Sequence, residues 1–555
     1  MKLRTALTGL LAGVAIFVAA PALALPSIAE KTAGMTRLDG YFPLYWDTAA
    51  GKLWLEIPRF DEEFIYYPSL QAGLGSNDVG LDRGRLGEER LVRFERVGPK
   101  VLLVAPNLRY RATSDNPAER RAVRESFAEG VLWGTTAVAE TGGRVLVDAT
   151  DFVVRDAVGA VDALKRTKQG AFKIDMARSA IYPAGTKAFP ENTEMEARIT
   201  LVSDDPGAFV REVAAEPEAV TLAIHQSFVK LPPPGYRPRA YDPRSSFSGT
   251  GFADYSTPVG TPLNRRFIVR HRIEKKDPTA AVSEPVKPII YYLDPGTPEP
   301  IRSALLEGAR WWSQAFEAAG FKNGFRVEML PEGADPLDIR YNVIQWVHRS
   351  TRGWSYGASV IDPRTGEIIK GKVTLGSLRV RQDYLIAEGL LAPYQKGVPE
   401  AAGDPMLAMA LARLRQLSAH EVGHTLGLMH NFAASTTGRA SVMDYPAPLA
   451  TLTSNGRPTL EAAYATGIGE WDKVSIRLGY SQFAPGTDEK KALEAIVDEA
   501  RRRGLKYLTD QDGRGTLGAQ PYVNTWDNGR DPLEGMKLEM DVRRAALARF
   551  GVANI

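Results

Sequence analysis

Residues 420–430 read HEVGHTLGLMH, and they hold three of the six histidines in this 555-residue chain. His420 and His424 are four residues apart, so on a helix their rings project from the same face, one turn apart. Two imidazoles at this spacing can bind one cation at about 2.0–2.1 Å each. Glu421 lies beside them, one position around the helix, and can reach a metal-bound water without itself being a ligand. The stretch therefore predicts a helix that carries a metal site.

Gly427 predicts the end of that helix, because a chain that reverses direction there needs a positive φ, which glycine adopts at low cost. The reversed chain would bring His430 to the same cation. Three histidine ligands leave a fourth tetrahedral position for water, which is the arrangement of a catalytic zinc site. A structural site usually takes sulfur as its fourth ligand, and the chain has no cysteine. We therefore predict one catalytic Zn²⁺ ion bound by His420, His424 and His430.

The sequence before the metal helix is typical of a mixed α/β domain. Residues 289–293 predict a buried strand. A helix is expected with Thr297 as its N-cap, Pro298 as its first residue and Gly320 at its end. FRVEML and YNVIQWV predict two more strands, and SYGASVI, DPRTGE and IIKGKVTL predict a hairpin. The metal helix itself is expected to begin at Pro405, with Asp404 as its N-cap.

The first half of the chain reads mainly as strands and turns. KLWLEIP, RLVRFERV and TEMEARITLV are rich in aromatic and β-branched residues, and a helical pattern is expected only around residues 117–127. Two proline-rich stretches follow, KLPPPGYRPRAYDPRSSFSGTG and KKDPTAAVSEPVKP. Segments of this composition are linkers or wrapping loops, so a domain boundary is expected near Pro285.

These patterns predict an α+β multidomain protein. A β-rich N-terminal domain is expected over residues 25–115, and a second β-rich domain with the proline-rich linkers over residues 116–284. The mixed α/β zinc domain is expected over residues 285–450. A mostly helical C-terminal segment is expected over residues 451–555, with helices around residues 491–503 and 532–550.

The first 24 residues predict a secretory signal peptide. Lys2 and Arg4 precede an apolar run over residues 7–20, and Ala22-Leu23-Ala24 is a small-x-small cleavage site. The alternative is an uncleaved membrane anchor, for which the apolar run is short. No later segment reaches the 18 or so apolar residues of a membrane span. We therefore expect export to a periplasm or to the outside of the cell.

Charge and cysteine content exclude several classes of partner and modification. The formal net charge is +3, without the basic excess that nucleic-acid binding needs. The absence of cysteine excludes disulfides and lipid attachment through a cysteine. The oligomeric state is left open by the sequence.

Met443 and Tyr445 follow thirteen and fifteen residues after His430, in SVMDYP. With the motif HExxHxxGxxH, Met443 matches the metzincin signature position by position. The chain also resembles the bacterial secreted zinc-dependent metalloproteases with upstream domains of unknown function, through SVIDPRTGEI, HNF and GIGEWDKVSIRLGY. The resemblance implies that Met443 lies beneath the imidazoles, that Tyr445 lies near zinc and that residues 356–361 form a substrate-pairing edge strand. The alternative for each side chain is an ordinary role in the core.

We therefore predict a secreted zinc endopeptidase that acts on protein or peptide substrates. Glu421 is expected to be the general base, and Tyr445 is expected to assist catalysis. Two alternatives stay open: a catalytically silent, zinc-stabilised envelope or binding protein, and a hydrolase of a non-peptide amide or ester. The β-rich region is expected to stay docked on the zinc domain, because a region of its size is large for a removable plug.

Overall fold

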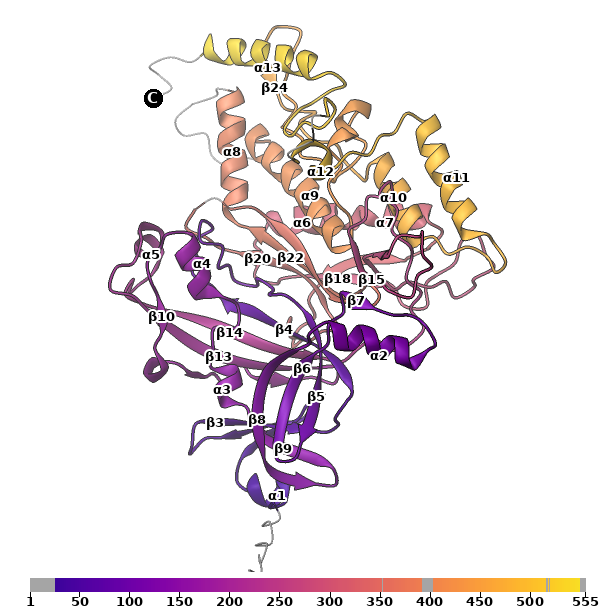
Figure 1. The fold of residues 1–555 in the computed structure, drawn as a ribbon. Helices are drawn as coiled ribbons and strands as arrows, with labels where there is room; N and C mark the ends of the chain where they lie inside the picture. The colour runs from indigo at the N-terminus through magenta and orange to yellow at the C-terminus, as the bar shows by residue number, and fades with distance from the viewer. Residues whose placement is uncertain (1–24, 352, 392–402, 516–517, 519, 550–555) are drawn as a thin grey trace, which may run out of the picture.

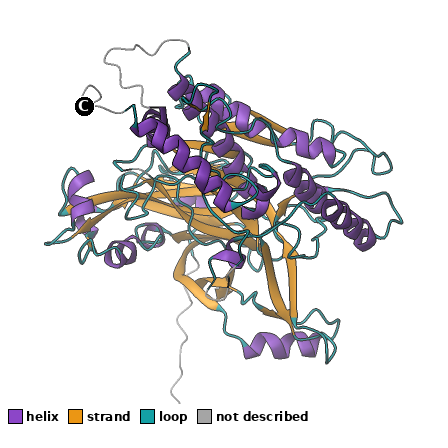
Figure 2. Cartoon of the chain, turned by 90° about the horizontal axis from the view of Figure 1, so that it is seen from above, coloured by secondary structure: helices purple, strands orange, loops and turns teal. Residues whose placement is uncertain are grey.

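The computed structural model describes residues 25–351, 353–391, 403–515, 518 and 520–549. The predicted signal peptide, residues 1–24, lies outside these described residues. The N-terminal strands form the lower half of the molecule in Figure 1, and a second sheet lies above them beneath most of the helices. Figure 2 shows helices spread over the strands when the molecule is seen from above.

The lower half is built on a 13-stranded sheet with the order β1-β2-β3-β9-β8-β6-β5-β4-β14-β13-β10, in which β11 and β12 also pair with β13. The strands are β1 (Thr36–Leu38), β2 (Leu44–Asp47), β3 (Lys52–Ile57), β4 (Glu63–Ala72), β5 (Arg90–Val97), β6 (Lys100–Ala105), β8 (Gly130–Thr141), β9 (Arg144–Asp148), β10 (Lys173–Ile174), β11 (Ala180–Ile181), β12 (Lys187–Ala188), β13 (Asn192–Val202) and β14 (Ala219–Val229). The domain boundary expected between residues 115 and 116 falls inside this sheet, because β6 pairs with β8. The two β-rich regions therefore share one sheet.

Alternation along the long strands builds the core of the lower half. Met195, Ile199 and Leu201 of β13 are fully buried in one apolar cluster with Phe228 of β14. Successive residues of a strand point to opposite faces, so Glu194 and its neighbours of the same parity lie on the other face. Over residues 192–196 that second face is also buried, and it lies toward the upper half: the Asn192 side-chain amide donates to the Leu337 carbonyl oxygen at 2.9 Å.

The upper half contains a six-stranded sheet with the order β17-β22-β20-β18-β19, and β21 pairs with β22. Its strands are β17 (Arg270–His271), β18 (Ile289–Leu293), β19 (Phe325–Met329), β20 (Asn342–Val347), β21 (Tyr356–Asp362) and β22 (Glu367–Gly376). The predicted hairpin is confirmed as the antiparallel pair β21–β22. β17 lies upstream of the boundary expected near Pro285, yet it is a strand of this sheet.

Helices cover one face of the upper sheet. Leu305, Trp312 and Leu417, from three helices, share one buried cluster with Val373 and Leu375 of β22. The helices of the chain are α1 (Ile28–Lys31), α2 (Pro117–Ser126), α3 (Thr150–Val153), α4 (Ala160–Arg166), α5 (Ala208–Val213), α6 (Ile301–Arg310), α7 (Trp312–Ala318), α8 (Leu378–Leu391), α9 (Pro405–Thr425), α10 (Glu470–Tyr480), α11 (Glu489–Arg502), α12 (Asp510–Gly513) and α13 (Pro532–Leu547). The expected α+β fold class is confirmed, with a β-rich N-terminal region, a mixed α/β domain and a partly helical C-terminal part. In the described residues, no helix is long and apolar enough to cross a membrane.

The prediction of one helix from Pro298 to Gly320 is wrong about the residue where the helix begins and about its being continuous. The structure has α6 from Ile301 and α7 from Trp312, with a break between them. Thr297 is not the N-cap, because its hydroxyl donates to the Asp294 carbonyl oxygen at 2.9 Å and so completes a turn instead. Gly320 has φ +87 and lies just after the end of α7, as expected.

The β-rich half covers the other face of the upper sheet. Tyr67 and Leu91 of the lower sheet share a buried apolar cluster with Ile339 and Val360 of the upper half. A short three-stranded sheet of β7 (Tyr110–Arg111), β15 (Gly249–Asp254) and β16 (Asn264–Ile268) lies beside it, and β23 (Thr451–Leu452) pairs with β24 (Pro458–Thr459). The two halves therefore pack against each other through apolar contacts and through buried polar ones.

Candidate metal centre

α9 positions the first two histidines. The Asp404 carboxylate accepts from the Met406 N–H at 2.8 Å, so the predicted N-cap is confirmed. Sixteen residues later the same helix presents His420 and His424, whose Nε2 atoms are 3.2 Å apart. Two ligands about 2.0–2.1 Å from one tetrahedral ion would be about 3.3–3.4 Å apart. The helix thus holds these nitrogens at a separation that suits one zinc ion.

Gly427 turns the chain back, as the sequence predicts. α9 ends at Thr425, and Gly427 follows with φ +100. A Cβ atom at this position would lie 1.9 Å from the Val269 carbonyl oxygen, so both the conformation and the space require glycine. The Gly427 carbonyl oxygen accepts from the Ser248 N–H at 2.8 Å, which ties the turn to the upstream segment.

His430 completes a cluster of three imidazoles. One possible ligand atom from each of His420, His424 and His430 lies within 4.8 Å of the other two. The Nε2 atom of His430 is buried and has no hydrogen-bond partner. An unpartnered buried nitrogen is costly in a folded protein unless a ligand satisfies it, so this atom fits a bound metal ion.

The Nδ1 atoms of the three rings all have acceptors. Those of His420 and His424 lie 2.8 Å from the carbonyl oxygens of Val442 and Leu428, and that of His430 lies 2.6 Å from the Asp510 carboxylate. Carbonyl and carboxylate oxygens accept hydrogen bonds, so each Nδ1 carries the proton and each Nε2 keeps its lone pair for a metal. Sequence reasoning missed Asp510, which lies on the short helix α12.

Burial keeps the helical imidazoles neutral. Burial, together with the neighbouring imidazoles, lowers the pKa of His420 well below its usual range. Burial first, and then His430, lowers the pKa of His424 to about 4. Neutral imidazole is the form that binds a metal ion, so the site is prepared for one at neutral pH.

Met443 lies directly beneath the metal helix. It is buried, and a Cβ atom on Gly423 would lie 2.3 Å from its sulfur. The turn that carries it is held by Asp472 of α10, whose carboxylate accepts from the Ser441 hydroxyl at 2.5 Å and the Val442 N–H at 2.8 Å. The same Val442 orients His420, so Asp472 supports the metal centre through this turn.

Glu421 is buried between α9 and the edge strand β21. Burial raises the pKa of its carboxyl to about 8, against smaller lowering effects of Arg413 and the Gly357 N–H. A cation bound beside it would lower that pKa again. A Cβ atom on Gly357 would lie 2.3 Å from the Glu421 carbonyl oxygen, so the strand approaches the helix closely.

Tyr445 places its ring beside two of the imidazoles. The ring centroids of Tyr445 and His430 are 4.5 Å apart, and those of Tyr445 and His420 are 5.2 Å apart. Burial raises the pKa of the Tyr445 phenol to about 12, so it stays protonated at neutral pH. The Trp526 ring stacks on the Tyr445 ring with centroids 5.4 Å apart, and the backbone N–H of Trp526 donates to the Tyr445 carbonyl oxygen at 2.8 Å.

Two family models match the chain. Residues 403–554 match a family described as Met-zincin, and residues 84–276 match a domain of unknown function, DUF5117. The first match covers the three clustered histidines. Residues 403–554 therefore form a metzincin-type metalloprotease domain. This membership implies a zinc metallopeptidase, with a DUF5117 domain upstream. Comparison with curated proteins and with solved structures gives no match.

A cleft of about 420 Å³ opens beside the metal ligands of this metzincin. Gly357, Ser359 and Ile361 of β21 line it, together with His424 and His430. Upstream residues 89, 248 and 269 also line it, so the β-rich half forms part of its wall.

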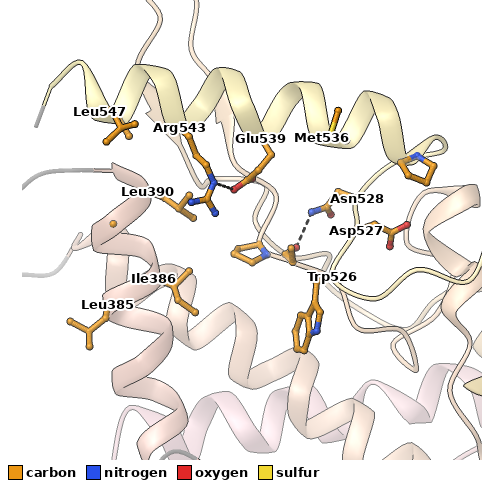
Figure 3. Close-up of a pocket in the computed structure, with 16 residues that line it drawn as sticks. Leu385, Ile386, Leu390, Trp526, Asp527, Asn528, Met536, Glu539, Arg543 and Leu547 are labelled. Carbon is orange, nitrogen blue, oxygen red and sulfur yellow. Dashed lines mark hydrogen bonds and ion pairs between the residues drawn. The ribbon is translucent and has the colours of Figure 1, made fainter. Parts of the chain in front are cut away.

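A larger cavity of about 850 Å³ lies between α8 and α13 of the metzincin (Figure 3). Leu390, Met536 and Leu547 are among its apolar lining, and Trp526 forms part of its wall. Figure 3 shows Glu539 and Arg543 of α13 facing each other above it, and they form an ion pair at 2.8 Å. None of the three clustered histidines lines this cavity.

The remaining histidines lie outside the cluster. His225 lies between Glu194 and Glu196 in the lower sheet, and His271 contacts the Tyr291 hydroxyl at 2.9 Å. The Nδ1 atom of His348 lies 2.9 Å from the Ser377 hydroxyl. Each therefore has ordinary protein partners.

Proposed function

We propose that this metzincin is an exported zinc endopeptidase in which His420, His424 and His430 bind the zinc ion. The observation that carries the proposal is the convergence of three imidazoles whose Nδ1 atoms all face oxygen acceptors, next to a buried carboxylate that is not one of the ligands. When bound, zinc lowers the pKa of water and polarises a carbonyl group. Export is supported by the signal-like pattern of residues 1–24.

The proposed base is Glu421. Its carboxylate accepts a proton from the attacking water and delivers it to the nitrogen of the leaving amine. The Tyr445 hydroxyl, which is protonated at neutral pH, donates a hydrogen bond to the oxyanion that develops on the scissile carbonyl. Because β21 pairs only with β22 among the described strands, its other edge can pair with the backbone of an extended substrate.

Casein zymography of the full chain, with and without a chelator, tests this function. Cleavage that the chelator abolishes and added zinc restores is expected. Glu421→Gln should abolish cleavage and keep zinc bound, because the carboxylate is a base and not a ligand. Glu317→Gln, on the exposed surface of α7, is the matched control and should behave as the unaltered chain.

Other outcomes would overturn the proposal or part of it. Loss of zinc in the Glu421→Gln protein would contradict the role of Glu421 as a base that does not bind the metal. Zinc binding without any hydrolysis would favour a silent zinc-stabilised protein. Hydrolysis of esters or non-peptide amides, with casein left intact, would favour a hydrolase of another class.

A further inference from the structure

The loop between β4 and β5, residues 73–89, holds the β-rich half against the catalytic half. Asp82 of this loop forms a two-pronged ion pair with Arg349 at 2.8 and 2.9 Å, and both side chains are buried. The Ser350 N–H donates to the Gly75 carbonyl oxygen at 2.8 Å. A buried pair of this geometry holds two surfaces in one register.

The end of the same loop packs against the substrate-pairing strand. Leu86 and Leu91 belong to the apolar cluster that also contains Val360 of β21. Beyond this strand, Arg364 forms an ion pair with Glu63 of β4 at 2.9 Å. Glu89 lies between the two leucines, so these contacts fix its position relative to β21.

Glu89 lines the same cleft as His424 and His430. Within the described part of the chain its carboxylate forms no ion pair, and the neighbouring Arg90 pairs with Glu88 at 2.8 Å. Burial raises the pKa of the Glu89 carboxyl, and the backbone N–H of Glu89 and the Arg90 charge offset this only in part. The group of possible metal-ligand atoms within 4.8 Å of one another is made by the three histidines and does not include Glu89.

The other described residues that line the cleft provide no positive charge to pair with Glu89. Among the described residues that line it, none is lysine or arginine. Asp510 is the second acidic residue there, and it is occupied by His430 at 2.6 Å and by Arg514 at 3.3 Å. An apolar side chain would leave the Glu89 carboxylate desolvated and unpaired, and an acidic one would be repelled.

We infer that Glu89 is a specificity-determining residue that selects peptide substrates with a lysine or arginine side chain at one position near the cut. The DUF5117 domain then contributes to substrate choice. This inference rests on the proposed peptidase function. It predicts that the cleavage sites in an unfolded protein carry a basic residue at one fixed distance from the cut.

Cleavage-site mapping by mass spectrometry on unfolded casein tests the inference in the full chain. The unaltered protein should show lysine or arginine enriched at one position. A lysine peptide built on a mapped site and its glutamine twin then give a ratio of kcat/KM values. Glu89→Gln should lower this ratio about tenfold, and Glu89→Arg should reverse the preference toward an acidic side chain. Glu125→Gln, which changes an exposed carboxylate of α2 outside the cleft, should keep the ratio.

Peptide binding separates the failure of this inference from the failure of the peptidase function. Capped alanine peptides, with a lysine or a glutamine moved along the chain one position at a time, are titrated into the Glu421→Gln protein. Tighter binding of one lysine peptide, lost when Glu89→Gln is added, supports the inference even if casein is not cut. Equal binding of both peptide sets, or a basic preference that survives Glu89→Gln, would overturn it and leave the peptidase function standing.

Discussion

The hydrogen bond that orients His430 is made by a side chain, that of Asp510, so a substitution can remove it. The Nδ1 atoms of His420 and His424 face backbone carbonyl oxygens, which every side-chain variant keeps. The Nδ1 atom of His430 lies 2.6 Å from the Asp510 side chain. A partner of this kind fixes the orientation of the ring and raises its basicity as a ligand. Asp510→Ala therefore tests how far zinc binding depends on this support.

We expect Asp510→Ala to weaken zinc binding by roughly 10- to 100-fold, or about 1.4–2.7 kcal/mol. The lower part of this range is favoured, because the Asp510 side chain is 34% exposed and solvent screens its charge. Asp510→Asn keeps an oxygen that can accept from the His430 Nδ1 and loses only the charge. Its effect should therefore be smaller than that of alanine.

The measurement is competition between the metal-free full chain and a chromophoric zinc chelator, with circular dichroism to verify folding. Asp498→Ala is the matched control, because Asp498 is a half-exposed helical carboxylate that pairs with Arg501 at 3.5 Å, away from the histidines. Zinc affinity in folded Asp510→Ala equal to that of the control would refute the argument.

Three further predictions concern the turn, the interface and a buried histidine. Gly427 and Gly486 both have positive φ. A Cβ atom added at Gly427 would lie 1.9 Å from a backbone oxygen, whereas one added at Gly486 would have no atom within 4 Å. In urea unfolding, Gly486→Ala should cost about 1–2 kcal/mol, whereas Gly427→Ala should cost more and also reduce bound zinc. Arg349→Met should lower the free energy of unfolding by about 3–5 kcal/mol, because it leaves Asp82 buried and unpaired, and adding Asp82→Leu should recover most of the loss. Burial lowers the pKa of His271 from 6.5 to about 3, so the unfolded chain binds a proton that the folded chain does not, and stability falls as pH decreases from about 6.5 to about 3. His271→Gln should reduce this loss between those pH values, and an unchanged pH dependence would contradict the assignment.

Local patterns made part of the site predictable. The four-residue spacing of His420 and His424 and the glycine at 427 describe one helix and the turn after it, and the structure has both. The hairpin β21–β22 is also local, because alternation on both sides of one turn specifies it. Asp510 could not be found this way. It is one acidic residue among polar loops, and only the packing of the C-terminal part brings it to His430.

Composition indicated where the chain is irregular, but not what the irregular segments touch. The proline-rich stretch that contains Phe247 and Ser248 reads as a linker, yet Phe247 forms a bridge with Leu428, beside the metal ligands. Glu89 lies in a loop whose sequence contains no recognisable motif. Its position in the cleft follows from contacts with strands distant in sequence. Thr297 followed by Pro298 has the pattern of a helix start. In the structure the Thr297 hydroxyl closes a turn instead, and the helix begins later.

The bond between His430 and Asp510 joins residues 80 positions apart in the chain. Ribosomes add about 5–20 residues per second, so about 4–16 seconds separate the synthesis of the two partners. During that interval the imidazole exists without the carboxylate that orients it. A growing chain that has not yet reached residue 510 therefore holds zinc less tightly than one that includes it.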